Sequence, residues 1–422
     1  MKLYFVVQRY GDRVIGGAEA ACRQLALRMS STADVTVLTT CAEESTSWAN
    51  AYPAGQERDQ SVRVLRFPTA ANRSRRYEML SQRLFRQHHP SRRLEQKWVR
   101  AQGPYSPSLI KEITKRADEP DLWVFYTYLY YPTIAGLPHV SDKSVLHPAL
   151  HDEPAARLGI VRETLRSPAG ISLQTSEEWK LLIRFAGWPR GQIRLVGMGA
   201  DDERGNPDAF RKRAGLDSEP YLLYLGRVDR GKGTHKLALD FIRFKSNHPD
   251  NLKLVIAGPL VHEPPSHDDI ITTGPLSEDE RWDALEGCEI FVHPSPFESF
   301  GIVLIEAMMK GQPALVSRHS PVTTGHAIES RGAIPYGDTY DFESALAILR
   351  DEPAVARRLG DSARVYAERF RWEHVIERYR GFLEETSIPL DDVFPAESFC
   401  VGAGGFAQPS GYCRVFPENR KS

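Results

Sequence analysis

The chain has 422 residues, of which 41% are hydrophobic and 26% are charged. This length exceeds what one hydrophobic core usually organises, so we expect two domains, and the ordinary hydrophobic content excludes a globally disordered protein. The net charge of −1 gives no whole-molecule argument for binding nucleic acid.

The chain begins with an apolar run, Leu3 to Val7, that turns polar at Gln8. The run is too short for a signal peptide or a membrane-spanning helix, so it predicts a buried first strand and a cytoplasmic protein. Similar short runs alternate with helix-like stretches and favour a parallel sheet covered by helices on both faces. They predict strands at 35–39, 62–67, 122–126, 144–150, 171–174 and 193–196.

Two glycines, Gly16 and Gly17, lie between the first strand and a helix predicted over 17–30. Because glycine has no side chain, these positions would let a ligand approach the backbone closely. A simple tight turn is the alternative.

Residues 72–116 are strongly basic, because twelve Lys and Arg side chains face three Glu, a balance of +9. Apolar residues such as Leu84 and Trp98 are interleaved with these cations and suggest amphipathic helices. Such a segment could meet an anionic acceptor or the anionic inner surface of a membrane, as a peripheral contact. A solvated helical face accounts for the same pattern.

Two histidines lie at the strand predicted at 144–150. His147 lies within it, and His151 follows it directly. The carboxyl ends of parallel strands are where ligands bind in open α/β sheets, so either ring could touch a reacting ligand. A packing role is the alternative, and it suits His147 better than His151.

The alternation of strands and helices restarts after a loop at 197–220 that is rich in Gly, Asp and Pro. A second α/β domain therefore begins near Gly199. Residues 353–386 predict one long amphipathic helical stretch, and an irregular tail follows from about 389. The strands predicted for this half lie at 221–225, 252–257, 269–272, 289–293 and 313–317.

A Gly-rich loop, Gly226 to Gly233, follows the strand at 221–225 and carries two well-spaced cations. Arg227 can form two parallel hydrogen bonds to phosphate oxygens, and Lys232 can add a point charge. Together they could hold a diphosphate, although loops of this kind also occur in many other nucleotide-binding proteins.

The segment from His293 to Met308 follows another strand and opens a helix near Phe300. Backbone N–H groups at a helix start favour an anion, and Glu298, just before it, can accept hydrogen bonds from sugar hydroxyls. Glu306 lies among apolar residues, where a carboxylate needs a partner. Ribose hydroxyls would supply one, and neighbouring amides are the alternative.

The five cysteines show no zinc-type spacing, so we expect no structural metal. Cys22, Cys41 and Cys288 lie in apolar contexts typical of buried thiols. Cys400 and Cys413 lie in the Gly-rich tail, where a bridge between them stays open.

The sequence resembles the retaining glycosyltransferases of family 4, which have the GT-B fold of two Rossmann-like domains facing across a cleft. Four segments carry the resemblance, which spans roughly residues 1 to 385. They are Gly16 to Glu19 (GGAE), His151 to Pro154 (HDEP), Gly226 to Gly233 (GRVDRGKG), and the E-x7-E pair of Glu298 and Glu306.

The resemblance implies transfer of a hexose from a UDP- or GDP-sugar to a hydroxyl acceptor, with retention and without a metal or other cofactor. The acceptor would be a glycan, a lipid-linked sugar or a small glycoside. Glu298 would bind the donor sugar hydroxyls, with His151 near the reacting face as the second catalytic residue. The remaining donor-binding residues would be Gly16, Gly17, Arg227, Lys232, Ser299, Phe300, Gly301 and Glu306.

The same resemblance predicts a C-terminal helix that crosses back to the first domain. The domain boundaries are then 1–198, 199–370, a returning helix at 371–388, and the tail at 389–422. Two other classes stay open: a sugar-nucleotide epimerase or phosphorylase of similar two-domain shape, and a non-catalytic nucleotide-binding protein.

Overall fold

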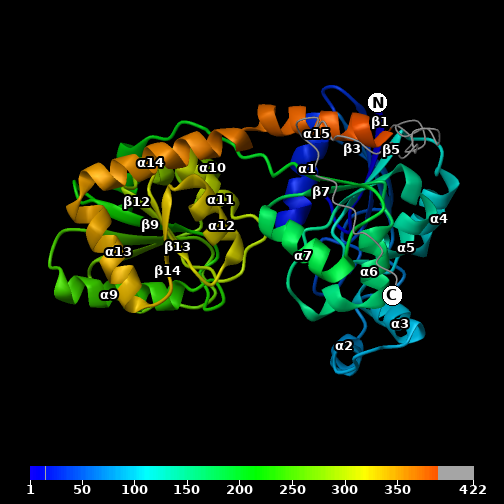
Figure 1. Ribbon diagram of the computed structural model, residues 1–422, viewed down its shortest axis with the longest axis horizontal. Coiled ribbons are helices and arrows are strands. Elements are labelled where there is room, and N and C mark those ends of the chain that lie inside the picture. Colours follow the sequence, from blue (N-terminus) through cyan, green and yellow to red (C-terminus); the bar gives the residue numbers. More distant parts are fainter. Residues whose placement is uncertain (15, 388–422) are drawn as a thin grey trace, which may run out of the picture. The chain divides into compact units, whose positions relative to one another are not determined.

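The computed structural model describes residues 1–14 and 16–387. They form two α/β parts of the predicted class, each built on its own sheet (Figure 1). The predicted irregular tail at 389–422, with Cys400 and Cys413, lies outside the described residues. Cys22, Cys41 and Cys288 are buried free thiols, as expected.

Among the described residues, the first sheet has eight strands in the order β3-β4-β2-β1-β5-β6-β7-β8. β3 pairs antiparallel with β4, and the other neighbouring strands are parallel. The strands are β1 (Lys2–Val6), β2 (Asp34–Thr40), β3 (Gly55–Asp59), β4 (Val62–Phe67), β5 (Leu122–Tyr126), β6 (Ser144–His147), β7 (Gly170–Leu173) and β8 (Gln192–Leu195).

Side chains of the first sheet alternate between two apolar layers, because successive residues of a strand point to opposite faces. Tyr4 and Val6 of β1 lie in one layer, and Leu3 and Phe5 in the other. The surrounding helices are α1 (Gly17–Met29), α2 (Tyr77–Phe85), α3 (Arg92–Gln102), α4 (Pro107–Lys115), α5 (Tyr131–Gly136), α6 (Gly159–Arg166) and α7 (Ser176–Ala186), with short 3-10 turns at Leu137–His139, Ser141–Lys143 and Pro154–Arg157.

The second sheet is parallel throughout, in the order β11-β10-β9-β12-β13-β14. It also has an apolar layer on each face. Its strands are β9 (Tyr221–Leu225), β10 (Lys253–Ala257), β11 (Ile270–Gly274), β12 (Ile290–His293), β13 (Ala314–Ser317) and β14 (Ala333–Tyr336). The helices around it are α8 (Pro207–Ala214), α9 (Thr234–Asn247), α10 (Glu278–Gly287), α11 (Ile302–Met309), α12 (Pro321–Ser330), α13 (Thr339–Asp351) and α14 (Pro353–Ala367).

The strand order reverses direction once in each sheet. β9 continues to β10 and β11 on one side, whereas β12 to β14 add on the other side, so the reversal lies between β9 and β12. In the first sheet it lies between β1 and β5. Ligands of open α/β sheets bind beyond the carboxyl ends of the strands at such reversals.

The stretch predicted as helical at 353–386 is helical over most of its length, but the chain breaks after α14. A 3-10 turn at Glu368–Phe370 and the extended residue Arg371 separate α14 from α15 (Trp372–Ser387). Phe370 packs in the core of the second sheet and Trp372 in that of the first. The break therefore lets the chain pass from one core to the other.

The last described helix, α15, belongs to the first sheet. Its inner face enters the apolar layer that contains Leu3 and Phe5 of β1, and Figure 1 shows it beside α1. The predicted return of the C-terminal helix is thus confirmed. The buried apolar residues of α15 are Trp372, Val375, Tyr379, Phe382 and Leu383.

Two strands were not predicted. β3 is a polar edge strand with the sequence GQERD, so no apolar run marks it. β14 is an edge strand that contains Pro335, and proline normally argues against a strand except at a sheet edge. In addition, β6 ends at His147, so residues 148–150 are not part of a strand.

Within residues 1–14 and 16–387, no helix is both long enough and apolar enough to cross a lipid bilayer.

Candidate active site

The Gly-rich loop connects β9 to α9 and is organised by Asp229. One carboxylate oxygen of this buried residue accepts a hydrogen bond from the backbone N–H of Lys232 (2.7 Å), and the other pairs with Arg227 Nε. The backbone carbonyl of Asp229 accepts a further bond from Thr234 Oγ1 at the start of α9 (2.9 Å). The loop is therefore held in shape by its own residues.

Gly233 brings this loop against the one that follows β12. Its φ of +79° lies in the left-handed region that favours glycine. A Cβ at this position would lie 2.7 Å from the carbonyl oxygen of Pro294, which is closer than atoms can pack. The two loops consequently meet at the point where the strand order of the second sheet reverses.

Lys232 and Glu298 form an ion pair where these loops meet. Lys232 Nζ lies 2.6 Å from Glu298 Oε1, and the side chain of Glu298 is only 15% exposed. His293 Nε2, at the end of β12, lies 3.3 Å from the same oxygen. Burial alone would raise the pKa of Glu298, but His293 and Lys232 outweigh it and lower that pKa to about 2.

Glu306 lies on α11 and is almost fully buried, and its partner comes from a different helix. Arg281 Nη1 on α10 donates to Glu306 Oε2 at 2.5 Å. Arg281, and not a neighbouring amide, is the partner that the structure gives Glu306, and binding of ribose hydroxyls by Glu306 stays a prediction. Burial raises the pKa of Glu306 to about 7, although Arg281 opposes this rise.

The start of α11 is fixed by packing behind it. Phe300 is 1% exposed, and its carbonyl oxygen accepts a hydrogen bond from His326 Nε2 (2.9 Å). Gly301, with a φ of +80°, turns the chain into the helix, and Ser299 precedes them in the same loop. These residues present a helix N-terminus beside Glu298, which suits a polar or anionic ligand group.

Gly16 and Gly17 have different surroundings at the start of α1. A Cβ at Gly16 would lie 2.2 Å from Glu19 Oε2, so glycine is needed here because a buried Arg9–Glu19 ion pair lies directly beneath. No atom lies within 4 Å of the corresponding position at Gly17. Open space for a close ligand approach thus exists at Gly17, whereas packing explains Gly16.

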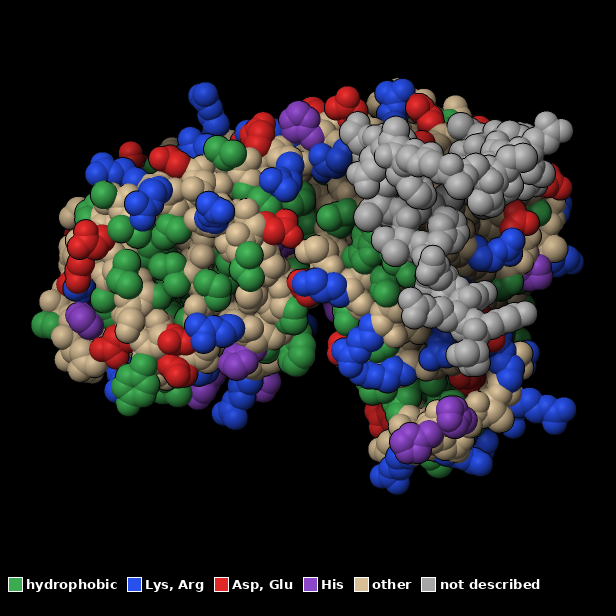
Figure 2. Space-filling view, viewed as in Figure 1, with side chains coloured by type: hydrophobic (Ala, Val, Ile, Leu, Met, Phe, Trp, Pro, Cys, Tyr) green, Lys and Arg blue, Asp and Glu red, His purple; other side chains and the backbone are tan. Residues whose placement is uncertain are grey.

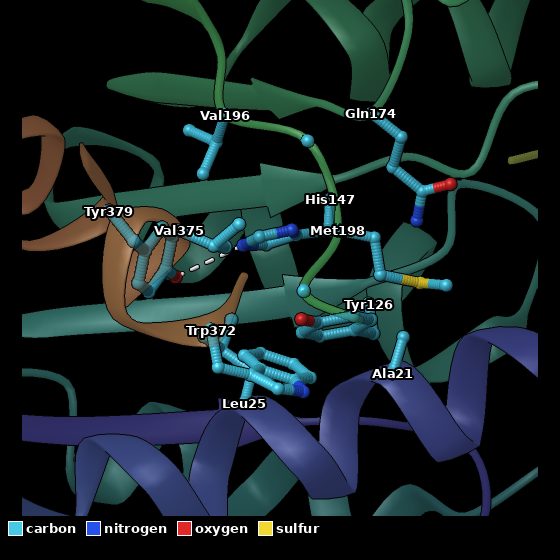
Figure 3. Close-up of a pocket in the computed structure, with 12 residues that line it drawn as sticks. Ala21, Leu25, Tyr126, His147, Gln174, Val196, Met198, Trp372, Val375 and Tyr379 are labelled. Carbon is cyan, nitrogen blue, oxygen red and sulfur yellow. Dashed lines mark hydrogen bonds between the residues drawn. The ribbon is translucent and has the colours of Figure 1, made fainter. Parts of the chain in front are cut away.

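The two candidate histidines, His147 and His151, differ in their burial. His147 is buried, stacks on Tyr126 at a centroid distance of 4.5 Å, and its Nε2 lies 3.0 Å from the hydroxyl of Tyr379 (Figure 3). Burial lowers the pKa of His147 to about 3. The ring borders a cavity of about 20 Å³. Its burial and its contacts with Tyr126 and Tyr379 show that it packs in the core. His151, in contrast, is exposed.

The structure brings only some of the predicted residues together. Lys232 and Glu298 are in direct contact, whereas Arg227 and Glu306 each pair with a different residue. No hydrogen bond or ion pair among the described residues joins these four to Gly16, Gly17 or His151. The described residues also contain no group of three His, Cys, Asp or Glu side chains arranged to hold a metal.

Sequence reasoning gave no role to Arg281 or His293. Arg281 is 25 positions from Glu306, and only the apolar surroundings of Glu306 signalled that a partner must exist. His293 lay in the segment singled out above, and its place at the end of a strand was the signal that could have identified it.

Residues 206–335 match the family model of the Glycosyl transferases group 1. The matched residues include both loops of the site as well as Arg281 and Glu306.

Curated relatives include two D-inositol 3-phosphate glycosyltransferases. The one from Rhodococcus opacus is 29% identical over 252 residues, which cover 54% of this chain and 56% of the relative. The one from Nocardia farcinica is 27% identical over 272 residues, with 60% and 59% covered. The chain therefore spans somewhat over half the length of the curated relatives that it matches.

Solved structures resemble a larger part of the chain. Sucrose-phosphate synthase from Thermosynechococcus elongatus has a TM-score of 0.66 and 18% identity, covering 91% of this chain and 98% of its own. Anabaena HepE in complex with UDP and glucose has a TM-score of 0.63 and 14% identity, covering 91% and 100%. The likeness shows the fold, and the predicted GT-B fold is confirmed.

Proposed function

We propose that this protein is a retaining glycosyltransferase that moves a hexose from a UDP- or GDP-sugar to a hydroxyl group of a glycan, a lipid-linked sugar or a small glycoside. The observation that carries the proposal is the contact between Lys232 and Glu298, where the loops after β9 and β12 meet. The match of residues 206–335 to the group 1 glycosyl transferases supports it.

In this proposal the second sheet holds the donor. Lys232 and Arg227 leave their carboxylate partners to bind the diphosphate, Glu306 accepts hydrogen bonds from the ribose, and Glu298 accepts them from the sugar. Backbone amides of Ser299, Phe300 and Gly301 help to hold the sugar. Gly16, Gly17 and His151 of the first sheet would complete the site around the phosphate and the reacting face.

The chemistry is a group transfer without a covalent enzyme intermediate. The bond between the anomeric carbon and the diphosphate oxygen breaks, a bond to the acceptor oxygen forms on the same face, and the acceptor proton passes to the departing diphosphate. The cations and the start of α11 stabilise the negative charge that develops on the leaving group. We expect no metal ion or other cofactor to be required.

Donor screening tests the function directly. Thermal unfolding in the presence of UDP, GDP and their sugar conjugates should show an increase in melting temperature with one nucleotide class, and mass spectrometry should detect the glycosylated product. Absence of any stabilising nucleotide contradicts the proposal. Turnover of donor alone, or a strict need for inorganic phosphate, would instead identify an epimerase or a phosphorylase.

Three variants test the assigned roles. We expect Lys232→Ala and Glu306→Ala to weaken donor binding by about 10- to 100-fold, the effect of one hydrogen bond to a charged group. Glu298→Ala should lower the transfer rate by about 100-fold or more, because it removes a contact to the reacting sugar. Isothermal titration and product formation measure the two effects.

The matched control is Lys236→Ala on α9. Lys236 lies four positions after Lys232, but its Nζ pairs with Asp240 at 2.5 Å rather than with Glu298. This variant should bind donor as the parent protein does. Unchanged binding and turnover in all three site variants would exclude the assigned roles.

We also propose a cytoplasmic protein that contacts anionic lipid through the segment 72–116. This segment carries exposed cations that lack an acidic partner, and its helix α2 also carries two exposed apolar side chains, Met79 (60% exposed) and Phe85 (37%). Figure 2 shows Lys, Arg and His side chains gathered over the region where Figure 1 draws α2 and α3. Mixed cationic and apolar surfaces of this kind bind the interface of anionic bilayers.

A further inference from the structure

His293 at the end of β12 is a buried polar side chain without a hydrogen bond. Its side chain is 7% exposed, and within the described residues neither ring nitrogen has a hydrogen-bond partner. Buried polar atoms in folded proteins are almost always hydrogen-bonded, so each exception needs an explanation. The explanation here lies in the neighbouring carboxylate.

Glu298 Oε1 has two nitrogen neighbours at different depths. Lys232 Nζ is 2.6 Å away on a side chain that is 31% exposed, whereas His293 Nε2 is 3.3 Å away on the buried side. The ring is held nearly parallel to Phe291, at an angle of 22°. Lys232 therefore covers Glu298 from the solvent side, and His293 supports it from within.

The proposed function requires this arrangement to change. Lys232 must bind the donor diphosphate, and Glu298 must accept hydrogen bonds from the sugar, so the ion pair between them cannot persist unchanged. A buried carboxylate that loses its charged partner is strongly destabilised unless another donor replaces it. His293 is already within reach of the same oxygen.

We propose that His293 is a positioning residue for Glu298. When the donor diphosphate takes Lys232, Nε2–H of His293 donates to Glu298 Oε1 and keeps the carboxylate aimed at the sugar. Donor binding thus exchanges the Lys232–Glu298 ion pair for a His293–Glu298 hydrogen bond. This inference rests on the proposed function, because it assumes that diphosphate and sugar bind at Lys232 and Glu298.

The exchange makes the role of His293 specific to ligands that carry the diphosphate. A nucleoside without phosphate leaves Lys232 paired with Glu298, so its affinity should not depend on His293. A sugar nucleotide takes Lys232 away from Glu298 and also needs the carboxylate aimed at its sugar. A residue needed only for folding would change the affinity for both ligands alike.

Isothermal titration of the full chain tests this, with uridine and guanosine compared against UDP-glucose, UDP-N-acetylglucosamine and GDP-mannose. We expect His293→Leu to weaken binding of the sugar nucleotide by about tenfold, as for loss of one hydrogen bond to a charged group, while the nucleoside binds as before. His293→Gln, which retains an N–H donor, should recover most of the loss. His319→Leu, at an exposed histidine, is the matched control.

Equal weakening of both ligands by His293→Leu, or no weakening of either, overturns the positioning role. Failure of His293→Gln to recover sugar-nucleotide binding also overturns it. These results leave the proposed function standing, because the parent protein still binds a sugar nucleotide. If the parent protein binds none of the five probes, the proposed function and this inference fall together.

Discussion

Glu306 is a carboxyl group in an otherwise apolar helix, and its protonation is set by two opposing influences. Burial raises its pKa to about 7, and Arg281, paired with it at 2.5 Å, acts in the other direction. Only the carboxylate form accepts two hydrogen bonds from ribose hydroxyls. Donor binding should therefore depend on pH near neutrality.

We expect donor affinity to increase as the pH rises from about 6 to about 8, because Glu306 loses its proton over this range. Arg281→Met removes the neighbouring cation, which raises the pKa of Glu306 further and moves the increase to higher pH. Isothermal titration with UDP or GDP across this range measures the midpoint. A midpoint that is the same with and without Arg281 would contradict the assignment.

The free energy of unfolding should change with pH in the opposite direction to donor affinity. Because the pKa of Glu306 is about 7 in the folded protein and near 4.5 when unfolded, the folded state holds a proton that the unfolded state has lost between these values. Stability contributed by Glu306 is thus present at low pH and declines as the pH rises from 4.5 to about 7. Glu306→Gln cannot titrate, so it serves as the control for both slopes.

At the level of single residues, the sequence could predict contacts between residues that each lie between a strand and a helix. Lys232 and Glu298 each follow a strand and precede a helix, so their meeting could be inferred. The contact of Arg281 with Glu306 could not, because it depends on how α10 packs beside α11. The reason for Gly16 was equally hidden, since it lies in the buried Arg9–Glu19 pair.

At the scale of elements, α2 and α3 form a helical hairpin with a basic outer surface. The hairpin is fastened by Trp98, whose Nε1 donates to Ser81 Oγ at 2.9 Å and whose ring meets Phe85 edge-on. Glu95 on α3 points inward and accepts hydrogen bonds from the backbone N–H groups of Gly159 and Ile160 at the start of α6 (2.7 and 3.0 Å). Charge on the outer surface can therefore be changed without disturbing this attachment.

Replacing Arg75, Arg76, Arg83 and Arg86 together by Gln should abolish binding to vesicles of phosphatidylglycerol and phosphatidylcholine. Each cation near an anionic bilayer contributes about 1 kcal/mol, so four together amount to a loss of several hundredfold or more. Co-sedimentation measures the bound fraction, which should also fall with added salt.

The control for this prediction is Lys111→Gln with Lys115→Gln on α4, where exposed cations also lack acidic partners. Binding that survives the fourfold change but is lost in the α4 variant would assign the contact to α4 rather than to α2. Parent protein that fails to bind anionic vesicles even at low salt excludes membrane contact through this segment.

The elements that sequence patterns predicted are those with a clear apolar period. Buried strands such as β1 and β9 are continuous apolar runs, and both were found where expected. β3 and β14 lie at sheet edges, where one side of the strand makes no sheet contact and little apolar character is needed. The apolar period does not mark the division between α14 and α15, because their apolar residues share one helical spacing but enter two different cores; only the resemblance placed a boundary between residues 370 and 371.

At the scale of the whole described chain, the first sheet is completed by a helix that is distant in sequence. A chain that ends at Arg371 would lose α15 and expose the face that Trp372, Tyr379 and Phe382 cover. Burial of each large apolar side chain contributes about 1.5–3 kcal/mol, so the five lost from α15 approach the 5–15 kcal/mol total stability of a typical protein.

We expect this truncated chain to give no cooperative unfolding transition for the first sheet, whereas a chain that ends at Ser387 should unfold as the full chain does. Circular dichroism during heating makes the comparison. Equal melting temperatures for the two truncated chains would show that α15 is dispensable.

The return of α15 also sets the order in which the protein can be made. About 180 residues separate the end of β8 from the start of α15, and at roughly 5–20 residues per second a ribosome needs about 10 to 40 s to add them. During that interval the part of this apolar layer that α15 covers stays exposed beside α1, while the segment from α8 to α14 emerges without interruption. The half of the chain that is synthesised second can therefore finish folding first, and the earlier half is the one that chaperones would have to protect.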